Sequence, residues 1–124
     1  MTLHSLAKSL KGFCDEYDID WADIYYDYEP AQYMSGYLGI CRYKYHNDRS
    51  RYCIIGVRDI FEPSIIATHV IAWHEFCHAE IWIKEGTTDG HSIAWIKRVM
   101  RKPLTFIGGE FYLLFAYLYR SIRK

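Results

Sequence analysis

The segment His74-Glu75-Phe76-Cys77-His78 combines two imidazoles and a carboxylate at a spacing that could hold a metal ion. Positions i and i+4 lie on one face of an α-helix, so His74 and His78 can reach the same ion. Glu75 is turned by about 100° around the helix from His74. It is therefore poorly placed as a ligand, but it can reach a water at an open position of the metal and act as general base. The motif predicts a hydrolytic centre with one Zn²⁺ as its cofactor.

A catalytic zinc ion usually has three protein ligands and one open position. After the motif, the chain turns through a glycine-containing loop at residues 85–90 and then reaches His91, at the start of the next expected helix. An antiparallel return of that helix would bring His91 back to the motif, so we predict it as the third ligand. Asp89 is the alternative, with an oxygen ligand in place of the imidazole. Cys77 lies on a different face of the helix from His78 and cannot readily supply a fourth ligand.

Hydrophobic periodicity predicts the elements that carry these residues. Apolar residues at steps of three and four indicate helices, alternating apolar and polar residues indicate strands, and Asn47-Asp48 is typical of a hairpin turn. Pro63 and Gly86 bracket the motif helix, and Pro103 is expected to end the helix after it. The expected helices cover about residues 2–17, 64–84, 91–101 and 109–120, and the expected strands cover about 21–28, 36–45 and 51–57.

This order of elements predicts an α+β fold in a single domain of residues 1–124. An N-terminal helix precedes a three-stranded antiparallel sheet, and the H-E-x-x-H helix and further C-terminal helices cover that sheet. The apolar C-terminal segment 103–124 provides the last helix.

The composition excludes several classes of protein. The chain has 124 residues, 51% of them hydrophobic, with 15 basic and 15 acidic residues and no formal net charge. This length fits one domain and excludes a multidomain enzyme, and the hydrophobicity excludes intrinsic disorder. Zero net charge argues against a protein that coats nucleic acid. The apolar run 104–119 contains Glu110 and is shorter than the roughly 20 residues of a membrane span, so we expect no membrane partner.

The cysteines and the N-terminus indicate a compartment. The four cysteines contain no C-x-x-C pair, and the first residues show no apolar signal peptide. We therefore expect free thiols and a cytoplasmic protein.

The neutral total conceals an uneven distribution of charge. Residues 1–30 carry seven acidic and two basic side chains, a sum of −5, and residues 91–124 carry seven basic and one acidic, a sum of +6. Such runs are usually solvated faces, or the two ends face each other. Glu80 and Glu85 are likewise interpreted as solvated helix charges. The candidate nucleic-acid contacts are the basic residues of the helix after the loop: Lys97, Arg98, Arg101 and Lys102.

The segment from Trp73 to Ala79, with Asp89-Gly90-His91 and Trp95, resembles the SprT-like zinc metallopeptidases, which include the Spartan-type proteases. That family shows H-E-x-x-H-A on a helix, a short loop with D-G-H or H-G, and an aromatic residue a few positions later. The likeness covers roughly residues 36–100 and implies a minimal zincin-like core with Glu75 as catalytic base. The implied zinc ligands are His74, His78 and His91, and the residues implied to lie beside the site are Trp95 and Asp89.

The chain also departs from the family pattern. Ser92 follows the third histidine where a glycine is common, and segment 103–124 stands in place of a zinc ribbon or DNA-binding tail. A core of this size would suit a phage protein acting in a host cell. We expect a zinc metallopeptidase acting on a protein or peptide substrate. The alternatives are a catalytically inactive, metal-stabilised binding module and a protease associated with DNA.

Overall fold

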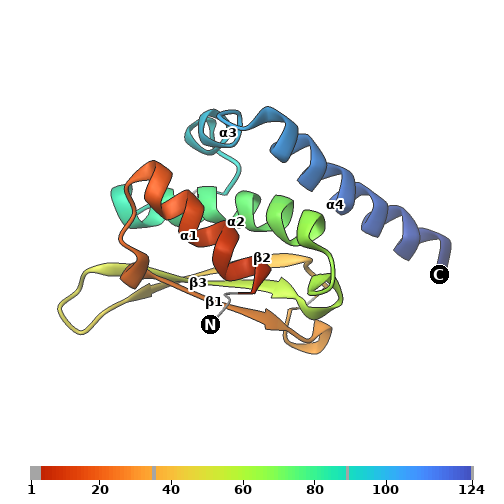
Figure 1. The fold of residues 1–124 in the computed structure, drawn as a ribbon, viewed down its shortest axis with the longest axis horizontal. Coiled ribbons are helices and arrows are strands. Elements are labelled where there is room, and N and C mark those ends of the chain that lie inside the picture. The colour runs from red at the N-terminus through yellow and green to blue at the C-terminus, as the bar shows by residue number, and fades with distance from the viewer. Residues whose placement is uncertain (1–3, 35, 89, 124) are drawn as a thin grey trace.

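The structure, a computed structural model, describes residues 4–34, 36–88 and 90–123, with the backbone alone at 116, 117 and 119–123. The fold is α+β, and a sheet forms one outer layer while helices lie on one face of it (Figure 1). The elements are α1 (Ser5–Tyr17), β1 (Ile24–Glu29), β2 (Gly39–Tyr45), β3 (Arg51–Arg58), α2 (Ile65–Glu85), α3 (Ile93–Val99) and α4 (Pro103–Arg123).

The sheet is mixed, so the prediction of an antiparallel sheet was wrong for one strand. β2 and β3 form the expected antiparallel hairpin, but β1 pairs with β3 in parallel, in the order β1-β3-β2. β3 takes the centre because it is the most apolar strand, with Cys53, Ile55 and Val57 completely buried. Because β1 and β2 lie on either side of β3, the connection over residues 30–38 must cross the end of β3. Two strand spacings amount to about 10 Å, which this connection is long enough to span. Local periodicity identifies strands but carries no information on which strands become neighbours.

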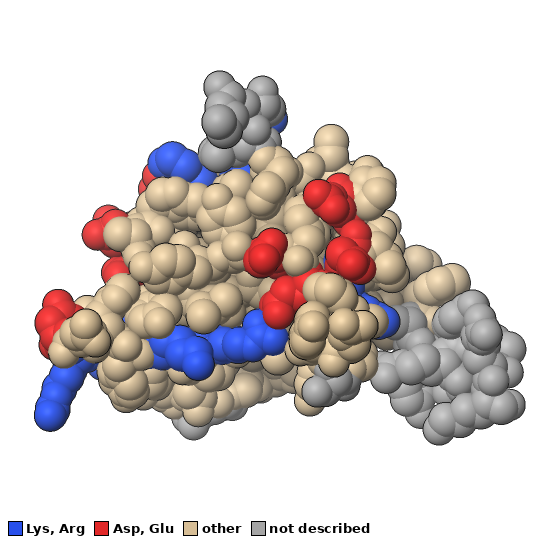
Figure 2. Space-filling view, turned by 90° about the horizontal axis from the view of Figure 1, so that it is seen from below, with Lys and Arg blue, Asp and Glu red and all other residues tan. Residues whose placement is uncertain are grey.

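The other face of the sheet is uncovered and charged. Figure 2 shows it from below, with Lys and Arg side chains in a stripe and Asp and Glu side chains grouped beside it. Arg42 of β2 and Glu29 of β1 form an ion pair of 2.7 Å across the sheet. Gly56 of β3 leaves the space for this pair, because a Cβ there would overlap the Glu29 carboxylate.

α2 is the central helix, and buried residues fall on all of its sides. Ser64 caps its start by accepting a hydrogen bond from the Ala67 amide, and Gly86 ends it in the left-handed conformation. These bounds agree with the helix expected from the sequence. Phe13 and Tyr17 of α1 pack their rings against Trp73 and Phe76 of α2, at centroid distances of 4.9–6.3 Å. This cluster fixes α2 above the sheet.

The C-terminal helices differ from expectation at Pro103. The helix expected over 91–101 is shorter, because Ser92 caps it and it ends at Val99. Pro103 begins α4 instead of only ending the preceding helix, which suits a residue whose missing amide costs nothing in a first turn. The outer face of α4 exposes apolar side chains such as Phe111, but no helix among the described residues is long and apolar enough to cross a membrane.

Two glycines let α4 approach α2 closely. A Cβ on Gly108 would lie 3.0 Å from Val70 Cγ1, and a Cβ on Gly109 would lie 3.0 Å from the Val70 carbonyl oxygen. Side chains at either position would push the two helices apart. The approach brings the next residue, Glu110, over the motif in α2.

Gly39 is a testable point of close approach between β2 and α2. A Cβ there would lie 2.7 Å from Ile71 Cγ2 and 3.1 Å from Glu75 Cγ, so Gly39→Ala should destabilise the protein by about 1–3 kcal/mol. Gly12 of α1 is the matched control, because its Cβ would meet nothing within 4 Å, and Gly12→Ala should stabilise by up to about 1 kcal/mol. Urea unfolding measures both. Equal stability of the two variants would contradict this description of the packing.

Candidate metal centre

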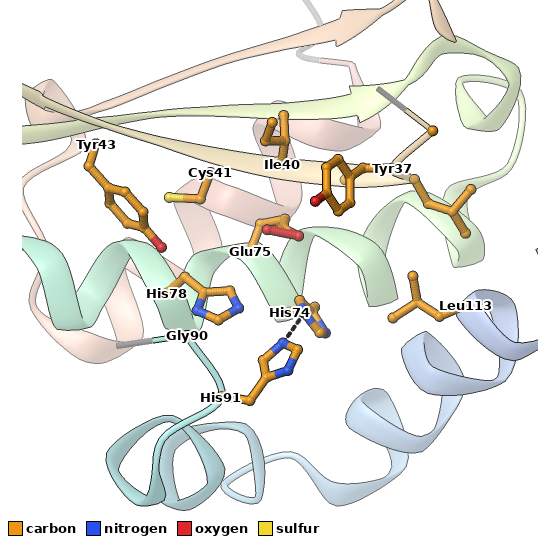
Figure 3. Close-up of a pocket in the computed structure, with 13 residues that line it drawn as sticks. Tyr37, Ile40, Cys41, Tyr43, His74, Glu75, His78, Gly90, His91 and Leu113 are labelled. Carbon is orange, nitrogen blue, oxygen red and sulfur yellow. Dashed lines mark hydrogen bonds between the residues drawn. The ribbon is translucent and has the colours of Figure 1, made fainter. Parts of the chain in front are cut away.

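Three histidines from two segments meet at the centre of α2 (Figure 3). His74 and His78 come from α2, and His91 comes from the segment before α3. The Nε2 atoms of His74 and His91 are 3.3 Å apart, and one ligand atom of each histidine lies within 4.8 Å of the others. In a tetrahedral site with Zn–N bonds of 2.0–2.1 Å, two nitrogens are about 3.3 Å apart. The His74–His91 pair already has this spacing, and the whole cluster is compact enough for one ion.

Trp95 of α3 holds the loop histidine against α2. Its buried ring stacks on His78 at 5.1 Å and 16°, and its centroid lies 4.3 Å from that of His91. The indole nitrogen donates a hydrogen bond of 3.4 Å to the His74 carbonyl. The residue expected beside the site therefore contacts all three histidines. Asp89, the alternative ligand, lies outside the described residues.

The surroundings favour neutral imidazoles at two of the three positions. Burial, together with the nearby His74 and His91, lowers the pKa of His78 to about 3. Burial and His74 likewise lower the pKa of His91. Burial acts in the same direction on His74, but Glu110 and Glu75 outweigh it and raise its pKa. A neutral ring keeps a lone pair for a metal ion, so the cluster is suited to bind a cation.

Glu75 lines the same cavity as the histidines. Its side chain is 7% exposed, and burial raises its pKa to about 7 against the opposing effect of His74. The cavity has a volume of about 510 Å³ and lies between α2, β2 and the His91 segment. Other residues that line it are Tyr37, Gly39, Cys41, Tyr43 and Leu113. Within the described chain, no Cys, Asp or Glu joins the three histidines at ligand distance, which leaves room for a water and for a substrate carbonyl.

The sequence reasoning missed Glu110. Its Oε1 atom lies 3.1 Å from Nδ1 of His74, on the other side of the ring from His91. The available signal was a single acidic residue in the otherwise uncharged run from Pro103 to Tyr119. That signal could not say where the helix docks.

Most of the basic residues considered for nucleic-acid contact are paired within the protein. Arg101 binds both carboxylate oxygens of Glu80, and its guanidinium lies 3.8 Å from the centroid of the Tyr17 ring. Glu80 is 2% exposed, so its interpretation as a solvated charge was wrong. The remaining pairs are Arg98 with Glu80 and Glu85, and Lys102 with Glu16. Lys97 is exposed, and the nucleic-acid contact stays a prediction.

No family model, curated protein or solved structure matches the chain. The resemblance to the SprT-like peptidases therefore depends on the motif residues and their geometry.

Glu75 predicts a pH-dependent loss of stability in the metal-free protein. Its pKa is raised from 4.5 to about 7 by burial, so the folded state keeps a proton that the unfolded state releases, and stability falls as the pH rises between these values. Glutamine has no charge to bury. The free energy of unfolding of Glu75→Gln minus that of the wild type should therefore be about 2–3 kcal/mol larger at pH 8 than at pH 5. Urea unfolding with chelator present measures this difference.

Glu62→Gln is the control for this measurement, because Glu62 is exposed. Its effect on the free energy of unfolding should vary little over the same range. A Glu75→Gln effect that is equally independent of pH would contradict the raised pKa.

Proposed function

We propose that the protein is a zinc-dependent peptidase that hydrolyses peptide bonds in a protein or peptide substrate. The observation that carries the proposal is the set of three imidazoles beside a buried carboxylate in an open cavity. His74, His78 and His91 would hold the zinc ion. When bound, zinc supplies Lewis acidity, which lowers the pKa of water toward about 7 and polarises a carbonyl group.

Glu75 would act as the general base and then as the general acid. Its carboxylate accepts a proton from the attacking water and returns it to the amine nitrogen as the peptide bond breaks. A group that must take and release a proton near neutral pH works best with a pKa close to that pH. In the metal-free protein, burial raises the pKa of Glu75 to about 7, and a bound cation would shift it back toward the charged form that accepts the proton.

The position of β2 supports a peptide as the substrate. In the order β1-β3-β2, β2 pairs with β3 on one side and is an edge strand of the described sheet. Gly39, Cys41 and Tyr43 of this strand line the cavity. An extended peptide can add to such an edge through main-chain hydrogen bonds, which would carry its carbonyl groups past the histidines.

Two observations bear on the alternatives. A metal-stabilised binding module would be favoured by a fourth protein ligand, and none of the described residues supplies one. A DNA-associated protease would need free cations near the site, but three of the four candidates, Arg98, Arg101 and Lys102, are paired with carboxylates, which leaves Lys97. The simple peptidase accounts for the geometry with fewer assumptions.

Glu75→Gln tests the mechanism. The variant should bind one zinc ion as the wild type does and lose cleavage by about 10²–10⁴-fold, because the amide cannot accept a proton. Elemental analysis gives the metal content, and a quenched fluorescent peptide library together with unfolded casein reports cleavage. Glu62→Gln is the matched control and should remain active. Cleavage that survives Glu75→Gln would refute the mechanism, and wild-type protein without zinc would refute the site.

Tyr43 is the candidate donor to the developing oxyanion. Figure 3 shows its hydroxyl directed toward the histidines, and burial raises its pKa, with Cys41 and Glu75 adding to the effect. The hydroxyl thus stays protonated and able to donate. Tyr43→Phe should lower kcat by about 10²-fold with little change in KM. Tyr45→Phe, an exposed tyrosine on the same strand, should leave kcat unchanged, and equal effects of the two variants would exclude this role.

A further inference from the structure

Glu110 and the metal position lie on opposite sides of the His74 ring. The carboxylate oxygen Oε1 is 3.1 Å from Nδ1, while Nε2 of the same ring faces Nε2 of His91 at 3.3 Å. A neutral imidazole carries one hydrogen. If Nδ1 carries that hydrogen and donates it to Glu110, Nε2 keeps its lone pair on the side where the three histidines meet.

The packing of α4 places this carboxylate. Gly108 and Gly109 let the helix pack closely on Val70, one turn before His74, because a Cβ on either glycine would lie only 3.0 Å from a Val70 atom. Leu113, almost one turn after Glu110, lines the cavity. From Pro103 to Tyr119, Glu110 is the only residue with a formal charge. Up to Tyr119 the helix thus carries one formal charge, at the point where it meets a histidine of the cluster.

We propose that Glu110 is a positioning residue of the metal centre. Its carboxylate accepts the Nδ1 hydrogen of His74, so the Nε2 lone pair of that ring is directed at the ion. Among the described residues, His74 alone of the three histidines has a carboxylate on a ring nitrogen. Partners of this kind fix the tautomer and orientation of a ligand and increase its basicity. The proposal rests on the proposed function in one respect, that the cluster binds a metal ion.

Zinc affinity without substrate is the direct test. Glu110→Ala should weaken zinc binding by about 10–100-fold, measured by competition with a chromogenic chelator. Glu110→Gln should weaken it less, because its amide oxygen can still accept the Nδ1 hydrogen. In metal-free protein, ¹⁵N NMR should show His74 with Nδ1 protonated in the wild type and a mixture of tautomers in Glu110→Ala. If the alanine variant does not fold, the zinc affinity and the His74 tautomer are both measured on Glu110→Gln.

Two further variants separate positioning from the docking of α4. Leu113→Ala removes partly buried apolar contacts of the same helix and should affect zinc binding less than Glu110→Ala does. As a single substitution, Gly109→Ala should push α4 away from α2 and weaken zinc binding. Combined with Glu110→Ala, it should cause little further loss of zinc affinity. Gly12→Ala, with open space around its Cβ, should leave zinc affinity unchanged.

Wild-type zinc affinity together with an unchanged His74 tautomer in Glu110→Ala would overturn the proposal, as would an equal loss in Leu113→Ala. The failure of the peptidase proposal would look different. A protein that binds zinc but cleaves no peptide would refute the function and leave the Glu110 result intact, because no substrate enters these measurements.

Discussion

The main constraint on this structure is that its candidate site lies on a helix with buried residues on all sides. α2 packs against α1, the sheet and α4, so few of the polar side chains along it can reach solvent. His74 and Glu75 are accommodated because β2 begins with a glycine, where a Cβ would overlap Ile71 and crowd Glu75, and because α4 crosses over Val70 on two glycines. The cavity is the space that these close contacts leave between β2, α4 and the loop with His91.

Two buried glutamates on α2 show how surroundings separate structure from reactivity. Glu80 is 2% exposed and is bound by Arg101, with Arg98 and Lys84 also within ion-pair distance. Glu75 is 7% exposed and has no cationic side chain bound to it in the described chain. The ion pairs of Glu80 offset the cost of burying its carboxylate, whereas burial without such a pair raises the pKa of Glu75 to about 7. The first fastens the C-terminal helices to α2, and the second is suited to proton transfer.

The parts of the site that could be predicted from sequence are those set by local spacing. His74 and His78 share a helix face because they are four residues apart, and His91 returns because a short loop joins two helices. The parallel pairing of β1 could not be predicted, because it depends on which strands become neighbours, and local periodicity does not show this. Glu110 could not be connected to His74 for a similar reason. Its position depends on α4 beginning at Pro103 and docking at Gly108 and Gly109, contacts with a helix more than thirty residues earlier.

Part of the charge asymmetry of the chain is used in the packing of the C-terminal helices. Arg98 and Arg101 pair with acidic residues of α2, and Lys102 pairs with Glu16 of α1 at 2.8 Å. Because these pairs hold α3 and the start of α4 against the body of the protein, they also hold His91 and Glu110 near His74. The histidine cluster is therefore supported by ion pairs that lie outside the cavity. A cation bound by the three histidines would also stabilise the charged form of Glu75, which burial alone disfavours. The site and the docking of the C-terminal helices thus stabilise each other, since each requires the other's residues to be in place.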